Sequence, residues 1–161
     1  MTILLGIDPG SIRTGYGLIH ANKQTVIHIA HGTIRAKGDS VAARLHYIYT
    51  ALCDIILTHK PERVAIEEVF MQINVQSALK LGQARGAALM ASAKYALPLH
   101  EYSARTIKKT ATGYGAASKE QVQLMIQKQL ALSMAPEADA ADALAIAICD
   151  ACCSSNILTQ S

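Results

Sequence analysis

Four acidic residues stand where an unpaired charge is costly unless it binds something. Asp8 ends one apolar run and Glu67 ends another. Asp139 and Asp142 are three residues apart in an alanine-rich segment, so on a helix they would share one face. Carboxylates suit hard divalent cations, and two such ions about 4 Å apart can activate water and stabilise a leaving oxygen. The four acids therefore predict a divalent-metal site able to hydrolyse a phosphodiester.

Each acid also has a simpler interpretation that involves no metal. Asp8 opens the segment Asp-Pro-Gly, which is typical of turns. Asp139 can complement the dipole of a helix N-terminus, whereas Asp142 lies beyond the first turn and gains little from it. Glu68 directly follows Glu67, so in a strand it should point to the opposite face. We therefore expect Glu67, and not Glu68, to belong to the site.

Runs of apolar and β-branched residues between turn signals predict five strands, and apolar residues at helical spacing predict four helices. The strands are expected at residues 2–7, 15–19, 25–34, 63–66 and 97–101. The helices are expected from 41 past 55, and at 75–95, 118–129 and 136–151. Asp39 or Ser40 is the expected cap of the first helix, and Ser118 forms a capping box with Gln121.

The order of these elements predicts the architecture. An antiparallel meander of three strands is followed by helix, strand, helix, strand and further helices, which fits an α/β fold. We expect a mixed five-stranded sheet of the ribonuclease H-like kind, flanked by helices on both faces. If the strand that ends at Glu67 runs parallel beside the strand that ends at Asp8, both acids emerge at one edge. Residues 1–153 are expected to form a single domain, with 154–161 as a short C-terminal tail.

Composition narrows the class of protein without naming a function. Hydrophobic residues make up 51% of the 161, which predicts a globular chain with one substantial core. The net charge of +3 permits a nucleic-acid partner but does not require one. The apolar run that precedes Asp8 is shorter than the hydrophobic region of a signal peptide, so no signal peptide is expected. No later segment is expected to span a membrane.

The cysteines and histidines do not have the spacing of a metal site. Cys149 and Cys152 resemble half of a zinc site, but no second such pair exists in the sequence. Cys153 lies beside them, so a disulfide framework is not expected, and a reducing, cytoplasmic location follows. His28 and His31 are three apart in an expected strand, which predicts that they point to opposite faces.

Several motifs, in one order along the chain, carry a resemblance to a known family. They are GIDPGS at 6–11, TGYG at 14–17, IEEVF at 66–70, SALKLGQARG at 77–86 and ADAADALA at 138–145. Together they resemble the RuvC family of bacterial Holliday junction resolvases. The resemblance implies a homodimeric endonuclease that nicks four-way junction DNA symmetrically and leaves 5′-phosphate and 3′-hydroxyl ends. It also implies two Mg²⁺ ions per active site, with Mn²⁺ able to replace them, and two partners: a junction-binding protein and a branch-migration ATPase.

The resemblance also assigns roles to individual residues. The family's catalytic and metal-binding acids fall on Asp8, Glu67, Asp139 and Asp142. Its phosphate-binding lysines fall on Lys108, with the adjacent Lys109 as the alternative, and on Lys119. Phe70 is either a cap on the core or a platform that stacks on an unpaired base, and the resemblance favours stacking. Arg13 and Arg85 are further candidate DNA contacts. The chain departs from the family in lacking the basic tail with which relatives often end.

Two other functions fit parts of the sequence. The GIDPGS opening also resembles the phosphate loop of actin-like ATPases, but 161 residues leave no room for the second lobe that closes over a nucleotide. A catalytically silent junction-binding module is the other alternative. Such a module would gain by losing negative charge near phosphates, yet all four acids are present.

Gly82 and Gly86 mark either close packing on the chain's own sheet or the seam of a dimer.

Overall fold

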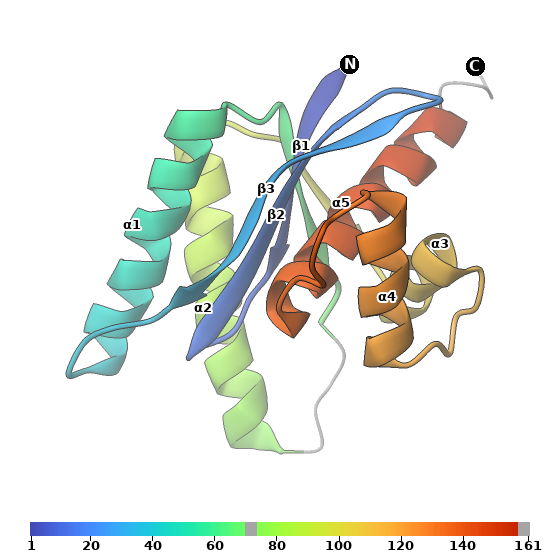
Figure 1. Ribbon diagram of the computed structural model, residues 1–161. Coiled ribbons are helices and arrows are strands. Elements are labelled where there is room, and N and C mark those ends of the chain that lie inside the picture. The colour runs from blue at the N-terminus through green and yellow to red at the C-terminus, as the bar shows by residue number, and fades with distance from the viewer. Residues whose placement is uncertain (70–73, 158–161) are drawn as a thin grey trace.

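The computed structural model describes residues 1–69 and 74–157, and its strands form one mixed sheet (Figure 1). The strands are β1 (Thr2–Asp8), β2 (Arg13–Ala21), β3 (Val26–Arg35), β4 (Arg63–Glu67) and β5 (Leu99–Tyr102). Their order across the sheet is β3-β2-β1-β4-β5. β1, β2 and β3 are antiparallel neighbours, while β4 pairs in parallel with both β1 and β5. The predicted meander and the predicted mixed sheet are both confirmed.

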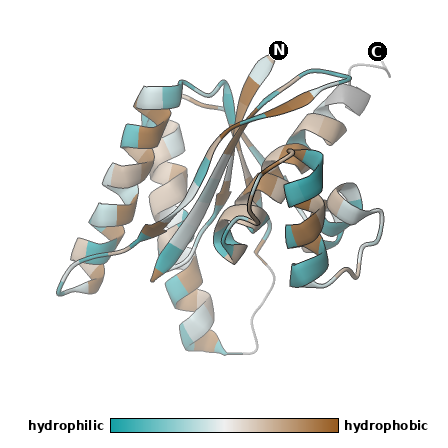
Figure 2. Ribbon diagram, viewed as in Figure 1, coloured by the Kyte–Doolittle hydropathy of each residue, from teal (hydrophilic) through white to brown (hydrophobic). Residues whose placement is uncertain are grey.

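Helices cover both faces of this sheet (Figure 1). They are α1 (Val41–His59), α2 (Val75–Lys94), α3 (Ala104–Thr112), α4 (Lys119–Gln129) and α5 (Ala138–Ile157). One apolar cluster joins α1 and α2 to one face, and a second joins α3, α4 and α5 to the other. The apolar colours of Figure 2 lie mainly along the strands and along the helix faces turned to them. The burial of these two clusters is the main term that holds the layers together.

The helix ends follow from local side-chain bonds. The hydroxyl of Ser40, rather than Asp39, caps α1 by accepting from the backbone of Ala43. Ser118 and Gln121 form the expected reciprocal capping box at the start of α4. α3 was not predicted from the sequence, although Ser103 caps its start. α5 continues to Ile157, so the predicted domain boundary at 153 falls inside a helix, and that division stays a prediction.

α5 lies unusually close to the sheet because its partners on the strands are glycines. A Cβ atom on Gly6 of β1 would lie 2.0 Å from the carbonyl oxygen of Ala143, and one on Gly15 of β2 equally close to that of Asp139. Real side chains cannot approach backbone so closely. The absence of a Cβ at these positions therefore lets the alanine-rich helix rest directly on β1 and β2.

The expectation that His28 and His31 face opposite sides of their strand is wrong. The pairing of β3 with β2 shifts register between Leu18 and Ile19, which marks a β-bulge. The extra residue in the bulge changes the alternation by one, so both rings lie on the same side. Nε2 of His28 is 2.7 Å from Nδ1 of His31. The nearby ring and partial burial lower the pKa of His28, with burial the larger cause.

α1 is the helix that bears on the expectation that no segment spans a membrane, and that expectation stays a prediction. By length and composition alone, α1 is long and apolar enough to cross one. Core helices often meet the same criteria, and here Ile48, Leu52 and Ile56 of α1 are buried in the cluster against the sheet. This burial accounts for one side of α1, whereas Val41 and Leu57 of the same helix are exposed.

Candidate metal centre

The parallel pairing of β1 with β4 brings two acids to one edge of the sheet. Asp8 is the last residue of β1 and Glu67 is the last residue of β4. In the register of the two strands Ile7 lies opposite Ile66, so the acids occupy the next position on each strand. Both strands are apolar runs buried on both faces, as expected of parallel strands covered by helices. The predicted meeting of Asp8 and Glu67 is thus confirmed.

α5 adds a third acid to this edge. Asp142 lines a cavity of about 290 Å³ together with Asp8 and Glu67. Asp139, one turn earlier, does not line the cavity, but its charge acts on both Asp8 and Asp142. The cavity is completed by side chains of α3, α4 and α5: Ala104, Ile107, Lys108, Lys119, Val122, Ala145 and Ile146.

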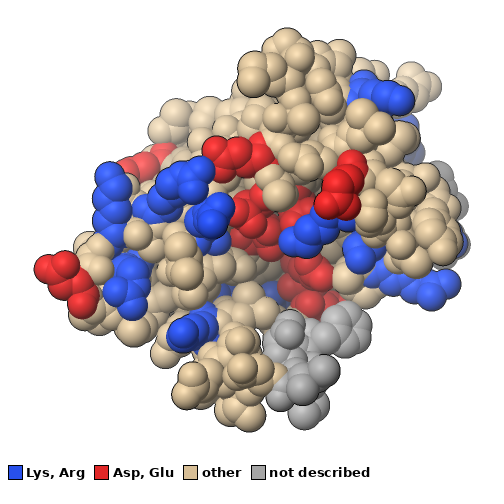
Figure 3. Space-filling view, turned by 60° about the horizontal axis from the view of Figure 1, so that its bottom comes forward, with Lys and Arg blue, Asp and Glu red and all other residues tan. Residues whose placement is uncertain are grey.

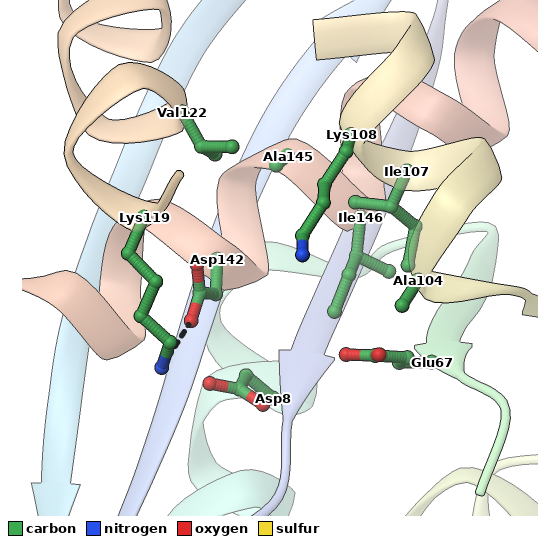
Figure 4. Close-up of a pocket in the computed structure, with 10 residues that line it drawn as sticks. All are labelled: Asp8, Glu67, Ala104, Ile107, Lys108, Lys119, Val122, Asp142, Ala145 and Ile146. Atoms are coloured by element: carbon green, nitrogen blue, oxygen red, sulfur yellow. Dashed lines mark ion pairs between the residues drawn. The ribbon is translucent and has the colours of Figure 1, made fainter. Parts of the chain in front are cut away.

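Two lysines face the acids from the helices above the cavity (Figure 4). Nζ of Lys119, at the start of α4, is 3.6 Å from Oδ2 of Asp142. Lys108 projects from α3 into the same cavity. Figure 3 shows that acidic groups gather in the middle of this face, with lysine and arginine side chains around them. The arrangement places cations beside a negatively charged hollow, where a phosphate could contact both.

The acids carry more negative charge than the lysines neutralise. Burial, the largest cause, and the charges of Asp142, Asp139 and Glu67 together raise the pKa of Asp8 to about 8, against the opposing effect of Lys119. Burial, followed by Asp142, likewise raises the pKa of Glu67. Burial is also the largest cause of the raised pKa of Asp142, against the opposing effect of Lys119. Such crowding of carboxylates is typical of sites that bind cations or perform acid–base chemistry.

The donor set fits a hard divalent cation. The ionisable lining of the cavity consists of carboxylates and lysines, without histidine or cysteine, which favours Mg²⁺ or a similar ion over zinc. In residues 1–69 and 74–154, no three acidic, histidine or cysteine side chains lie ready around a single ion. Mg²⁺ commonly takes one or two carboxylates and completes its shell with water and substrate phosphate. Asp8, Glu67 and Asp142 line one cavity without forming a closed shell, which matches an ion that also binds water and substrate phosphate.

The other predicted site residues are placed differently. The guanidinium of Arg85 donates to the backbone oxygen of Glu67 at 2.8 Å and pairs with Glu101 at 2.6 Å. Arg85 therefore supports the end of β4, and its role as a DNA contact stays a prediction. Arg13 is exposed at the start of β2, at the same end of the sheet as Asp8. Phe70 lies outside the described residues.

Two features of the structure were not predicted from the sequence. The first is α3, the helix that carries Lys108. Ser103 at its start and Gly113 in the left-handed conformation at its end were available as capping signals. The second is Asp150, a fully buried acid on α5 with four polar partners, whose isolated position in the sequence gave no signal.

Comparison with known proteins identifies the family. Residues 4–150 match the family model described as crossover junction endodeoxyribonuclease RuvC. A relative of that description from Coxiella burnetii is 58% identical over 149 residues, which cover 92% of this chain and 87% of the relative. Another, from Psychromonas ingrahamii, is 50% identical over 161 residues, covering 100% and 93%. The solved structure of T. thermophilus RuvC in complex with Holliday junction substrate superposes with a TM-score of 0.90 at 30% identity, covering 97% of this chain and 96% of that one. The chain belongs to the RuvC family of crossover junction endodeoxyribonucleases.

Proposed function

We propose that this protein resolves four-way DNA junctions by paired, metal-assisted nicks at the cavity between β1, β4 and α5. The observation that carries the proposal is the meeting of Asp8, Glu67 and Asp142 around one cavity that Lys108 and Lys119 also line. The RuvC relatives and the junction complex of T. thermophilus RuvC support it. They do not support a catalytically silent binding module or an actin-like ATP-binding fragment.

The acids are proposed to hold two Mg²⁺ ions, with Mn²⁺ able to replace them. The ligands would be Asp8, Glu67, Asp139 and Asp142. When bound, the ions supply the Lewis acidity that lowers the pKa of water and neutralises charge on the phosphate. Asp139 would reach its ion from the rim, since it lies beside the cavity and does not line it. The carboxylates would also orient the attacking water by accepting its hydrogen bonds.

The lysines are proposed to act on the phosphate that is cut. Water oxygen would bond to phosphorus, the bond from phosphorus to the 3′ oxygen would break, the water would lose a proton to solvent, and the 3′ oxygen would take up a proton from solvent. The products are a 5′-phosphate and a 3′-hydroxyl. Lys108 and Lys119 would stabilise the charge that develops on the phosphate oxygens, because their amino groups face the same cavity as the acids. Arg13 would contact a phosphate further from the cut, and Phe70 would stack on an unpaired base.

A homodimer is proposed to pair two such sites, with α2 as the seam. An apolar stripe on α2 is exposed: Val75, Leu79, Leu89 and Met90. A Cβ atom on Gly82 or Gly86 would meet nothing within 4 Å, so these glycines are not needed for packing on the chain's own sheet. Small residues beside an apolar stripe allow two copies of a helix to approach closely. Two equivalent cuts require two equivalent sites, which a twofold axis provides.

The remaining assignments follow from the same role. The protein would work in the cytoplasm, where bacterial DNA lies. A junction-binding protein and a branch-migration ATPase would be its partners. Co-purification of this chain with those two proteins on junction DNA would test that assignment.

The decisive experiment compares a synthetic four-way junction with a linear duplex, each with and without Mg²⁺. We expect cleavage only of the junction and only with the ion. Asp8→Asn, Glu67→Gln, Asp139→Asn and Asp142→Asn should each lower the cleavage rate at least about 100-fold while junction binding in chelator is kept or improved. Asp54→Asn, which changes an exposed acid on α1, is the matched control and should cut normally. Parental cleavage by any of the four variants would remove that acid from the site.

A further inference from the structure

Asp150 is a buried acid far from the cavity, and it binds several polar groups at once. Its side chain has no solvent exposure. Oδ2 accepts from Nε of Arg63 at 2.5 Å. Oδ1 accepts from Nδ1 of His100 and from the hydroxyl of Tyr102, both at 2.7 Å, and from the hydroxyl of Ser154 at 3.3 Å.

Stability alone is a weak explanation for this network. A buried ion pair loses hydration free energy that its attraction only partly recovers, and apolar residues of similar size often serve as well. α5 already packs through alanine, leucine and isoleucine side chains in a continuous apolar cluster. An ion pair with several hydrogen bonds adds a constraint on the orientation of the helix to such packing, because hydrogen bonds tolerate little change in angle or length.

The closest contacts of α5 with β1 and β2 are made by backbone at glycines, with the side chain of Leu144 packed on Gly17, and hydrogen bonds add a directional constraint to this packing. Gly6 of β1 touches the backbone at Ala143, and Gly15 of β2 touches the backbone at Asp139. Contacts between smooth backbone surfaces limit how closely a helix approaches a sheet. They resist sliding and rotation over the sheet much less. The network of Asp150 lies at the other end of α5, over β4 and β5.

The partners of Asp150 belong to the two strands that position the rest of the site. Arg63 is the first residue of β4, whose last residue is Glu67. Tyr102 lies opposite Glu67 in the register of β4 and β5. The next residue, Ser103, caps α3, the helix that carries Lys108. One carboxylate therefore links the helix of Asp142 to the strand of Glu67 and to the base of the helix of Lys108.

We propose that Asp150 is a positioning residue for strand cleavage: through Arg63, His100 and Tyr102 it fixes the slide and rotation of α5, and so the distance between Asp142 and Glu67. The proposal rests on the nuclease function proposed for the cavity. Asp150 is eight residues beyond Asp142, about 12 Å along the helix, so it cannot touch the substrate phosphate there. A displacement of about 1 Å in a reacting group can cost roughly 100-fold in rate, even when its origin is remote.

Two substitutions test the proposal. Asp150→Asn keeps the shape of the side chain but cannot neutralise Arg63, and Tyr102→Phe removes a single hydroxyl and should leave the protein folded. Each purified variant is assayed for thermal unfolding, for junction binding in chelator, and for single-turnover cleavage at saturating protein over a Mg²⁺ series. We expect junction binding within about twofold of the parent, and cleavage slowed about 10- to 100-fold for Asp150→Asn and less for Tyr102→Phe. Both variants should also need more Mg²⁺ for half-maximal rate.

Ile48→Ala provides the control for lost stability. Ile48 is fully buried in α1 on the opposite face of the sheet and shares none of the bonds of Asp150. Once folded, this variant should cleave at the parental rate with the parental Mg²⁺ requirement. Equal slowing of Ile48→Ala, or parental rates in both network variants, would overturn the proposal. If instead Asp8→Asn cleaves as the parent does, the nuclease function proposed for the cavity fails.

Discussion

Replacing Asp8 with asparagine should stabilise the metal-free protein near neutral pH, although it destroys the proposed metal site. Burial and the neighbouring acids raise the pKa of Asp8 from 3.8 to about 8. The folded protein therefore binds this proton more tightly than the unfolded chain does. The stability that the protonated group contributes is fully present below about pH 4 and is lost as the pH rises through about 8.

The size of the effect follows from the shift. At pH 7 the folded protein still holds this proton whereas the unfolded chain has lost it, and this difference costs the folded state about 4 kcal/mol relative to pH 3.8, at about 1.36 kcal/mol per unit of pKa. Rotation of Asp142 and Glu67 away from Asp8, and water entering the open cavity, reduce this cost. We therefore expect Asp8→Asn to gain about 2 kcal/mol at pH 7, which raises the Tm of a chain of this size by about 4 to 8 °C.

The assay is urea and thermal unfolding in chelator at pH 4 and at pH 7.5. The gain of Asp8→Asn should be present at pH 7.5 and vanish at pH 4, where the parental carboxyl is also neutral. Asp54→Asn, at an exposed position of α1, should change stability by less than about 0.5 kcal/mol at either pH. Addition of Mg²⁺ should raise the Tm of the parent and hardly affect Asp8→Asn, because only the parent binds the ion well. An equal gain at both pH values, or none at pH 7.5, would refute the electrostatic account of this site.

Three other substitutions probe the phosphate contact, the dimer and the packing of α5. In junction-binding titrations, Lys119→Ala should reduce the slope of log affinity against log salt by about one unit, and it should also slow cleavage at saturating protein. An unchanged slope would remove Lys119 from the DNA contacts. Met90→Lys, at a 64% exposed position of α2, should give a monomer by light scattering and abolish paired nicking, whereas a stable dimer would move the seam elsewhere. Gly6→Ala should lower the free energy of unfolding by about 3 kcal/mol or more in urea titrations, since its Cβ would overlap the backbone of Ala143; a neutral effect would show that α5 shifts freely.

The strands and acids of the site could be predicted because several local signals agree. Parallel strands that are buried on both faces read as continuous apolar runs, so β1 and β4 were visible in the sequence. A charge at the end of such a run is costly, which singled out Asp8 and Glu67. Alternation along a strand separated Glu67 from Glu68, whose side chain is exposed.

The features that were missed depend on contacts that no local pattern reports. α3 buries only Ile107 and Ala111, too few apolar positions to establish a helical period. The partners of Asp150 include residues 48, 50 and 87 positions away in the sequence. The bulge in β3 brings His28 and His31 to the same face by a single extra residue, and the sequence has no glycine there to mark it.

The close approach of α5 to the sheet links the stability of the fold to the chemistry of the site. A helix that carried larger side chains, or strands with a Cβ at Gly6 and Gly15, would hold α5 further from β1. Asp142 would then move away from Asp8, because the two acids project from surfaces that these contacts hold together. Burial and, after it, the charge of Asp142 raise the pKa of Asp8, while burial and the charge of Asp139 raise the pKa of Asp142. The same glycines and alanines that let the core pack thus create the electrostatic demand that a pair of divalent cations would satisfy.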